Sequence, residues 1–469
     1  MASPIKFAGS PQTTPARPLF EFVRRRSTCA TVDRPSQPTI GGQGSGFGPD
    51  ENEPPSLRAA ASIFDFKPPI ACEVLDHGFA EVAEEAPAVA FAAADLSVYH
   101  NVHPASPSPL ESIISLAGVD DARLLFLSSK AASTGVSSAP VASGQTPPSY
   151  VVRAGLGSPS QQLLLSLDTS ADATWAHCSP CNTCPTNSLF VPANSSSYAS
   201  LPCSSSWCPL FEGQACPAQS DPSQSSAPLP TCAFSKPFVD ASFQAALASD
   251  SLRLGKDVIP NYAFGCVGSV TGPTTNLPKQ GLLGLGQGSM ALLSQSGSMY
   301  NGVFSYCLPS YKSYYFSGSL RLGAAGQPRS ARYTPLLKNP HRSSLYYVNV
   351  TGLRVGRAWV KVPAGSFAFD PNTGAGTVID SGTVITRWTA PVYAALRDEF
   401  RRQVAAPSGF TSLGAFDTSA TPLACLAMAE SPQNVNSVVN VVANLQQQNI
   451  RIVFDVANSR VGFAKEPCN

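Results

Sequence analysis

Along most of the chain, apolar residues occur in short runs separated by Gly, Pro, Ser and Thr. Such runs predict many short β-strands joined by turns. Residues 149–170 read SYVVRAGLGSPSQQLLLSLDTS, which predicts a strand, a glycine turn and a second strand ending at Asp168. The segments YYVNVTGLRVG and AGTVIDSG predict the same arrangement leading to Asp380. We therefore expect a mainly β protein in which two aspartates stand at strand ends.

Helical spacing of apolar residues is limited to a few segments. SPLESIISLA, residues 108–117, has Ser108 as N-cap, Pro109 at the first helical position and Glu at the third, which together form a capping box. DDARLLFLSS, residues 120–129, predicts a second short helix. Residues 387–404 predict an ordinary surface helix, because their apolar residues recur four apart.

The region before the predicted strands divides into two parts. Residues 1–94 have no sustained periodicity, and their first 30 residues contain Ser, Thr and Arg with one acidic residue, which is typical of a transit peptide. We expect 1–94 to be a disordered or transit-like leader. Residues 95–147 combine the first two helical segments with a Ser/Ala/Gly/Pro linker. This pattern favours a removable, propeptide-like segment over a simple helical cap.

Composition narrows the classes of function. The 31 Lys and Arg nearly balance the 30 Asp and Glu, so no overall basic field points to nucleic acid. No apolar stretch approaches the roughly 18 residues that span a bilayer. The 43 Pro and 35 Gly agree with a chain of strands and turns.

Thirteen cysteines are unevenly distributed, with eight between Cys178 and Cys266. CSPCNTC could suggest zinc, but the neighbouring cysteines lie in Ser/Pro-rich loops without a second regular pair. We therefore expect disulfides, no bound metal and an oxidising compartment. Two glycosylation sequons, at Asn194 and Asn349, agree with that compartment. The disulfide candidates are Cys178, Cys181, Cys184, Cys203, Cys208, Cys216, Cys232, Cys266, Cys307 and Cys468.

One phrase occurs twice: DTSADATWAHC begins at Asp168 and DSGTVITRW begins at Asp380. GLLGLGQGS and NVVANLQQQ follow in corresponding places, and NYAFGC, FSYCL and QQQNIRIVFD stand nearby. With these motifs, residues 148–469 resemble the pepsin-like aspartic peptidases, particularly the plant nepenthesin type near the chloroplast-nucleoid-protease-like branch. The resemblance implies a bilobal β fold with an active-site cleft between an N-terminal lobe, 148–335, and a C-terminal lobe, 336–469. The first lobe carries the cysteine-rich insertion.

The resemblance implies a catalytic pair. Asp168 and Asp380 would hold a water molecule that attacks the peptide bond, with no cofactor, because one carboxylate accepts a proton while the other carboxyl donates one. The hydroxyls of Thr169 and Ser381 would bond across to the opposite lobe. Thr383 would donate a hydrogen bond to Asp380.

Small residues are also expected beside the pair. Ser170 and Gly382 would be small because the two loops meet back to back. Ala171 departs from the family pattern, since it lacks the hydroxyl that would bond Asp168, and the loss raises a carboxyl pKa. At the flap over the cleft, Phe238 replaces the expected Tyr and cannot bond Trp175. The change at 171 should tune activity rather than abolish it, and the change at 238 predicts weakened catalysis.

The second lobe is apparently shortened. GAFDTS runs directly into ATPLACLAMAE, where relatives have several strands and a cysteine. Cys425 would then lack its partner, which predicts a free thiol and a disulfide-linked dimer of an otherwise monomeric protein. The resemblance pairs Cys307 with Cys468.

These observations predict a secreted, plant aspartic endopeptidase that acts on protein or peptide substrates. We expect a zymogen whose segment 95–130 lies across the cleft, where Arg123 or Lys130 could neutralise the two carboxylates. One alternative is a weak or inactive protease-like binding or inhibitor protein. Another is a nucleic-acid-binding plastid protease, which the transit-like leader favours and the charge balance opposes. The location would be extracellular or, alternatively, the chloroplast.

Overall fold

The computed structural model describes a large part of the chain. The described residues are 29–31, 94–100, 120, 123–124, 127, 150–211, 213–216, 230–238, 241–275, 277–310, 318–404, 423–425, 428–432 and 438–468. Two predictions fall outside them, namely the helix at 108–117 and the position of Lys130. The side chain of Cys425 also lies outside the described part.

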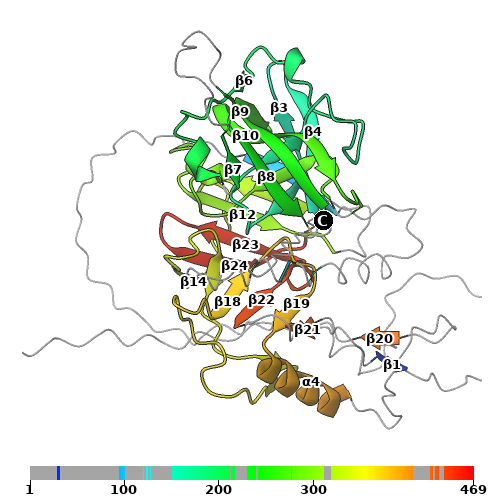
Figure 1. Cartoon of the computed structure of the whole chain (residues 1–469). Coiled ribbons are helices and arrows are strands. Elements are labelled where there is room, and N and C mark those ends of the chain that lie inside the picture. Colours follow the sequence, from blue (N-terminus) through cyan, green and yellow to red (C-terminus); the bar gives the residue numbers. More distant parts are fainter. Residues whose placement is uncertain are drawn as a thin grey trace, which may run out of the picture.

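The protein consists of two β lobes joined by antiparallel strands (Figure 1). The first lobe contains β3 (Tyr150–Leu156), β4 (Gln161–Asp168), β5 (Trp175–His177), β6 (Ala199–Ser200), β7 (Gln214–Ala215), β8 (Ala233–Phe238), β9 (Ala241–Leu254), β10 (Asp257–Thr271) and β11 (Gly281–Gly284), with η1 (Pro192–Asn194), η2 (Cys208–Leu210) and α3 (Leu292–Gln295). The second contains β15 (Tyr346–Val348), β16 (Arg354–Val355), β17 (Ala358–Trp359), β18 (Gly376–Ile379), β19 (Thr386–Trp388), α4 (Ala390–Val404), β21 (Met428–Glu430), β22 (Val439–Val442) and η3 (Asn444–Gln446). The expected mainly β, bilobal fold is confirmed.

The joining sheet has the order β3, β2, β13, β12, β23, β24, β14. Its remaining strands are β2 (Ala94–His100), β12 (Val303–Cys307), β13 (Gly318–Leu322), β14 (Arg332–Leu337), β23 (Ile450–Asp455) and β24 (Arg460–Lys465). Separately, β1 (Cys29–Thr31) pairs with β20 (Leu423–Cys425). Strand β2 was missing from the sequence prediction, although its buried Ala94, Leu96 and Val98 alternate with exposed residues as in a half-buried strand.

The two lobes repeat one arrangement of strands around their aspartates. In the first, β11 runs parallel to β4, so that Gly284 lies opposite Asp168. In the second, β22 runs parallel to β18, and Val442 lies opposite Ile379, the residue before Asp380. The repeated motifs of the sequence therefore correspond to repeated strand pairings.

The local sequence signals explain the strands that carry the aspartates. Gly157 has a φ of 92°, which favours glycine, and it lies in the turn that joins β3 to β4. The helix predicted at 387–404 is confirmed as α4, whose Val392 and Leu396 are fully buried. Three apolar clusters form the core, and the largest extends through both lobes.

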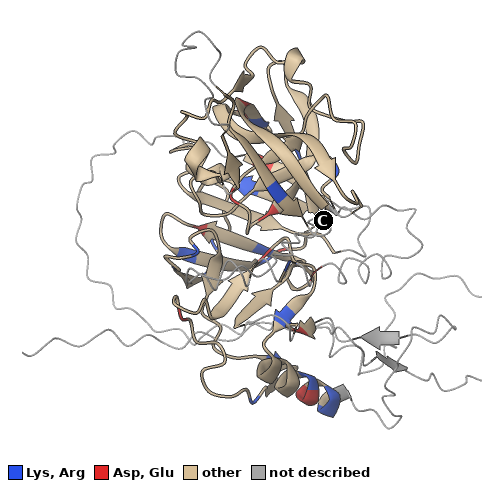
Figure 2. Ribbon diagram, viewed as in Figure 1, with Lys and Arg blue, Asp and Glu red and all other residues tan. Residues whose placement is uncertain are grey.

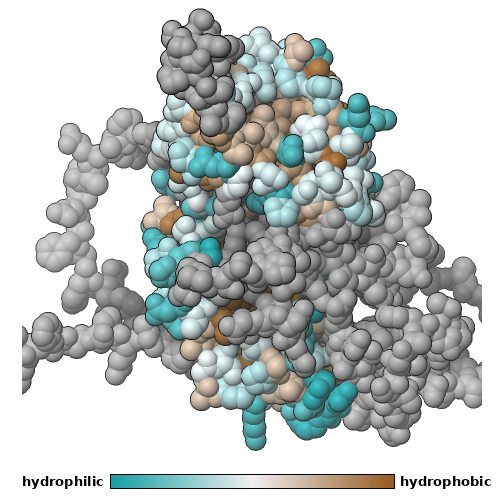
Figure 3. Space-filling view, in the orientation of Figure 1, coloured by the Kyte–Doolittle hydropathy of each residue, from teal (hydrophilic) through white to brown (hydrophobic). Residues whose placement is uncertain are grey.

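Charged residues are spread thinly over the ribbon (Figure 2). A denser group lies at the end of α4, where Arg402 forms an ion pair with Glu399 at 2.6 Å. On the face shown in Figure 3, hydrophobic residues gather on the upper lobe, where β8, β9 and β10 lie in Figure 1. None of the helices in the described segments is long and apolar enough to cross a membrane.

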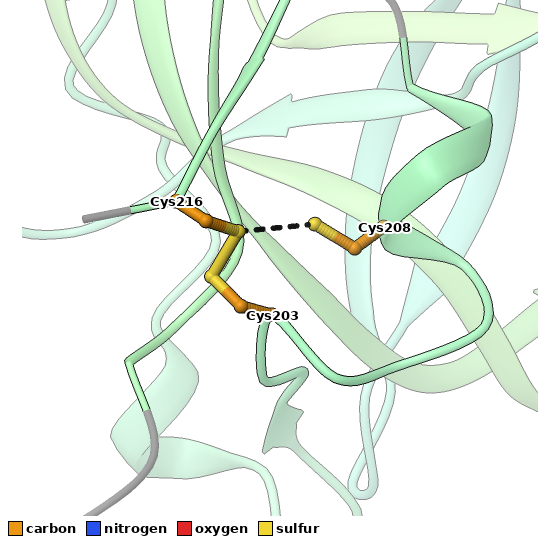
Figure 4. A group of neighbouring side chains, drawn as sticks. All are labelled: Cys203, Cys208 and Cys216. Carbon is orange, nitrogen blue, oxygen red and sulfur yellow. Dashed lines mark hydrogen bonds between the residues drawn. A yellow bond between two sulfur atoms is a disulfide. The ribbon is translucent and has the colours of Figure 1, made fainter. Parts of the chain in front are cut away.

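All ten candidate cysteines are in disulfides. The pairs are Cys178–Cys266, Cys181–Cys184, Cys203–Cys216, Cys208–Cys232 and Cys307–Cys468. In Figure 4 the Cys208 sulfur points toward that of Cys216. The two sulfurs are 3.6 Å apart, and with Cys203 they lie close enough together for a shared metal ion. Because each of these sulfurs is already bonded to another sulfur, none is a thiolate ligand.

We predict that the Cys307–Cys468 bond contributes most to stability, because it joins residues 161 positions apart. Loss of this bond in the double Ser variant should lower the free energy of unfolding by about 5 kcal/mol on the chain-entropy model. Removing Cys181–Cys184, which closes a separation of 3, should cost only about 2 kcal/mol. Urea unfolding of the two double variants makes the comparison, and equal losses would contradict it.

Candidate active site

Asp168 and Asp380 meet at the junction of the two lobes, and both side chains are fully buried. Asp168 ends β4, and Asp380 follows β18. The next residue of each loop bonds across to the other lobe. The Ser381 N–H donates to Thr169 Oγ1 at 2.9 Å, and the Thr169 N–H donates to Ser381 Oγ at 3.1 Å. These reciprocal bonds fix the two loops against each other.

Asp168 accepts hydrogen bonds from its own loop. The Ser170 N–H donates to Oδ1 at 2.8 Å, and the Ser170 hydroxyl donates to the same oxygen at 3.0 Å. Ala171 is buried and has no hydroxyl, as the sequence indicated. The structure corrects the reason given for Ser170: besides fitting a crowded loop, this residue supplies a hydrogen bond to the carboxylate.

Asp380 is held by a different set of donors. The Thr383 hydroxyl donates to Oδ2, and Thr169 Oγ1 lies 3.4 Å from Oδ1. The Gly382 N–H is 3.3 Å from Oδ1. A Cβ added at Gly382 would clash with Nη2 of Arg123, so this glycine makes room for a guanidinium, whereas the sequence had indicated that it would make room for the opposite loop.

Arg123 bridges the two carboxylates. Its Nη2 donates to Oδ1 of Asp168 at 2.7 Å and to Oδ1 of Asp380 at 2.8 Å. Its Nε donates to Oδ2 of Asp380 at 2.7 Å, and its Nη1 to Oδ2 of Asp168 at 3.0 Å. All three side chains are fully buried. One cation therefore occupies the space between the two carboxylates.

The charge of Arg123 changes the acidity of the site. Burial by itself raises the pKa of Asp168, but the guanidinium charge, with hydrogen bonds from Arg123 and Ser170, holds that pKa below its ordinary value. Burial lowers the pKa of Arg123, and the two carboxylates raise it by more, so the guanidinium remains charged. The arrangement is thus a buried cation between two anions.

A second anchor holds the same helical turn. Asp120 accepts hydrogen bonds from the N–H groups of Ile385 at 2.6 Å and Val384 at 3.1 Å. Burial raises the pKa of Asp120 to about 7, although the charge of Arg387 and the backbone donors oppose the rise. Asp120 was not among the residues singled out from the sequence. Its spacing of three residues from Arg123 was the available signal, because residues three apart share a helix face.

The flap candidates also meet. Phe238 ends β8, and its fully buried ring packs edge-on against Trp175 with ring centroids 6.0 Å apart. Phe243 of β9 contacts the same indole. A ring–ring contact thus stands where the resemblance implied a phenol hydrogen bond.

Other residues around the pair had no assigned role in the sequence. Gln447 Nε2 donates to the carbonyl of Asp380 at 3.1 Å, and Asn444 Nδ2 donates to the carbonyl of Ser381 at 2.9 Å. Both lie in the NVVANLQQQ motif, so the motif supports the second aspartate loop from behind. Asn194 and Asn349, the sequon residues, are both exposed.

Comparison with known proteins shows the family. The family described as "Xylanase inhibitor N-terminal" matches residues 150–324, and "Xylanase inhibitor C-terminal" matches 345–418 and 410–465. "Aspartyl protease 25" of Oryza sativa subsp. japonica is 79% identical over 416 residues, which cover 80% of this chain and 95% of that protein. The chain belongs to the plant branch of the pepsin-like aspartyl protease family.

More distant members of this aspartyl protease family match as well. "Aspartyl protease AED3" of Arabidopsis thaliana is 49% identical, with coverage of 78% of this chain and 88% of that protein. "Aspartic proteinase nepenthesin-1" of Nepenthes gracilis is 31% identical, covering 68% and 78%. The structure titled "Crystal structure of edgp" shares the fold, with a TM-score of 0.54, 19% identity and coverage of 81% of this chain and 96% of that one.

The match to the second half of the family comes in two stretches that meet near residue 418. This division is expected if part of the aspartyl protease second lobe is absent there. The disulfides agree with folding in an oxidising compartment.

We predict that the Ser170 hydroxyl compensates for Ala171. Changing Ser170 to Ala removes a hydrogen bond to the ionised carboxylate, so the pKa of Asp168 should rise. The acidic limb of the pH–activity profile, measured with a peptide substrate after acid treatment, should move upward by about 0.5–1 unit. Ser160→Ala, on the turn before β4, is the control and should leave the limb unchanged. No movement in Ser170→Ala would contradict the assignment.

Proposed function

We propose that the protein is an aspartic endopeptidase that is kept latent by its own residues 120–127. The observation that carries this proposal is the convergence of two aspartates, from equivalent loops of two lobes, on a single guanidinium. Both carboxylates bind the same nitrogen of that cation, so we infer that they can approach each other and share one proton once the cation leaves. Two adjacent carboxylates resist double ionisation, as they do in pepsin and the other aspartic proteases.

The mechanism follows from that geometry. With Arg123 withdrawn, a water molecule takes its place between Asp168 and Asp380. The ionised carboxylate accepts a proton from the water as it attacks the peptide carbonyl, and the protonated carboxyl donates to the carbonyl oxygen. The bonds between Thr169 and Ser381 keep the two loops in register during this exchange.

The latent state follows from the same contacts. Arg123 neutralises both carboxylates, and Asp120 is bonded to Val384 and Ile385, four and five residues after Asp380. A substrate therefore has no access to the pair while this turn is bound. Maturation would cut the chain in the 131–147 linker. We also propose that the protein is secreted, because it contains disulfides and is similar to plant aspartyl proteases.

Hydrolysis of denatured haemoglobin tests the proposal. Protein held at neutral pH should show little activity, whereas protein brought to pH 3–4 should cleave haemoglobin. Pepstatin, whose hydroxyl mimics the tetrahedral intermediate between the aspartates, should block the cleavage. Acid activity that pepstatin does not affect would contradict the mechanism.

A second candidate is a protein that binds other proteins without cutting them. Phe238 in place of a flap hydroxyl and the interrupted second lobe favour it. Acid-treated protein that binds pepstatin but cleaves neither haemoglobin nor peptides would support this function. We propose no nucleic-acid partner, since Lys and Arg form no continuous stripe on the described ribbon (Figure 2).

A further inference from the structure

The cysteines of the CSPCNTC motif do not all have the same surroundings. Cys181 and Cys184 are bonded to each other across two residues, whereas every other disulfide in the described part of the chain joins cysteines at least 13 positions apart. The Cys184 side chain is half-buried, and the intervening Asn182 and Thr183 are exposed. This disulfide therefore lies near solvent, and its spacing is one at which protein thiols are often reactive.

A histidine lies against one sulfur of this pair. His177 Nδ1 is 3.1 Å from Cys184 Sγ, and His177 Nε2 is 3.0 Å from the carbonyl oxygen of Pro278. A carbonyl oxygen only accepts hydrogen bonds, so Nε2 carries the proton of the neutral ring and Nδ1 is an acceptor. The ring is buried, and burial lowers the pKa of His177 to about 4, so the ring is neutral near pH 7. His177 therefore directs an acceptor at the Cys184 sulfur.

This acceptor fits the reduced state of Cys184 better than the disulfide. A disulfide sulfur has no hydrogen to donate, whereas a thiol carries one and is a donor. Reduction therefore gives the buried Nδ1 a hydrogen bond that the oxidised pair does not offer. A hydrogen bond made only after reduction stabilises the reduced form, and a stabilised dithiol makes its disulfide easier to reduce.

The loop around the pair has two further attachments to β10. Cys178, three residues before Cys181, is bonded to Cys266, and both cysteines of that bond are buried. The Thr183 hydroxyl accepts a hydrogen bond from the Val270 N–H at 2.8 Å. Both attachments remain when the neighbouring disulfide opens, so we expect the two thiols to stay close enough to form it again.

We propose that Cys181–Cys184 is a reversible thiol–disulfide exchange site, which small thiols of the glutathione class modify at Cys184 and reduce. The thiolate of one small thiol attacks Cys184 Sγ, the S–S bond breaks, and the released Cys181 thiolate takes a proton from water. A second small thiolate attacks the sulfur of the first, and an external disulfide forms. Cys184 leaves as a thiolate and takes a second proton, and its S–H then donates to His177 Nδ1.

The exchange is balanced, because two electrons pass to the protein and two small thiols become one disulfide. It uses none of the residues assigned to the aspartate pair. The inference therefore goes beyond the proposed function and does not depend on peptidase activity.

Cys203–Cys216 provides a matched comparison (Figure 4). Cys216 is exposed and Cys203 half-buried, and the Cys216 sulfur lies 3.6 Å from another sulfur, that of Cys208. In the three remaining disulfides of the described segments, every cysteine is less than 10% exposed. Exposure by itself predicts that Cys203–Cys216 is reduced first. Stabilisation by His177 predicts that the other half-exposed pair is reduced first.

The test is made on the full chain with glutathione as the probe. The protein is equilibrated at pH 7.5 in mixtures of reduced and oxidised glutathione, its thiols are trapped with N-ethylmaleimide, and each cysteine is mapped by mass spectrometry. The equilibrium constant for reduction of Cys181–Cys184 should be at least about tenfold larger than that of Cys203–Cys216. Reduction of Cys203–Cys216 first, or of both pairs together, would overturn the proposal.

A change at His177 tests the cause of the preference. His177→Phe keeps a ring beside Trp175, which the imidazole contacts with centroids 5.3 Å apart, and removes Nδ1. The equilibrium constant for reduction of Cys181–Cys184 should fall about tenfold. Asn182→Ala, an exposed change between the same cysteines, is the control and should leave the constant unchanged. An unchanged constant in His177→Phe would overturn the proposal.

A second pair of variants leaves the buried histidine in place. Cys181→Ser keeps the thiol of Cys184 beside the imidazole, whereas Cys184→Ser keeps the thiol of Cys181, which is 9% exposed. With oxidised glutathione, the mixed disulfide should form at Cys184 at least about tenfold faster than at Cys181. Equal rates, or faster modification of Cys181, would overturn the assignment. Haemoglobin cleavage is measured separately, so a protein without activity would reject the proposed function and leave this inference standing.

Discussion

Replacing Asp168 or Asp380 with Asn should reduce acid peptidase activity by roughly a thousandfold or more, because general acid–base catalysis then loses one of its two partners. Each carboxyl has a distinct task in the exchange, so the remaining aspartate should not restore activity in either variant. Haemoglobin or peptide hydrolysis at pH 3–4 measures the loss.

The control for these variants is Asp398→Asn. Asp398 lies on α4, outside both aspartate loops, and its exposed side chain pairs with Arg397 at 2.8 Å. Its activity should match that of the unmodified protein. Activity that persists in Asp168→Asn or in Asp380→Asn would reject the two-carboxyl mechanism.

Replacing Arg123 with Met should abolish latency. Breaking a buried ion pair by removing one partner typically costs about 3–5 kcal/mol, which corresponds to a factor of roughly 10²–10⁴ in the closed-to-open equilibrium. Pepstatin should therefore bind Arg123→Met at pH 6.5 at least about a hundredfold more tightly than it binds the unmodified protein. Arg153→Met, an exposed change on β3, should have no such effect.

The stability of the closed state, in which Arg123 lies between the aspartates, should depend on pH in a definite direction. The pKa of Asp168 is depressed in the closed state, so this group stabilises closure at neutral pH, and its contribution is lost as the pH falls through the depressed pKa. Asp120 acts in the opposite direction. Its pKa is raised from 3.8 to about 7, so its contribution to the stability of the closed state is lost as the pH rises through that range. Of these two groups, only Asp168 favours opening as the pH falls. Opening that is unchanged by pH in the unmodified protein would contradict this account.

The sequence by itself determined the architecture around the two aspartates. A strand, a glycine turn and a second strand are local patterns, and repetition of the motif around Asp168 and Asp380 indicated two related lobes. The position of α4 followed from its apolar spacing. The helical turn at Asp120 and Arg123 was also predicted from local spacing, and Arg123 was named as a candidate for the space between the carboxylates.

Tertiary structure decided which residues met around that pair. Ser170 became a donor to Asp168 because the loop geometry turned its hydroxyl inward, which no sequence pattern specifies. The place of Arg123 between the carboxylates, and the binding of Asp120 to the N–H groups of Val384 and Ile385, depend on how one helical turn lies against a distant loop. Such contacts join residues more than 250 positions apart in the chain; Arg123 and Asp380 are separated by 257 positions.

The strand at Ala94–His100 shows the physical reason for this division. Its alternating pattern is a local signal, but its partners β3 and β13 are far along the chain, and only the folded sheet places it between them. In the same way, Leu124 and Leu127 look like the apolar side of any short helix. Local periodicity indicates that these leucines need cover, and only the three-dimensional packing determines that Val378 and Val441 provide it.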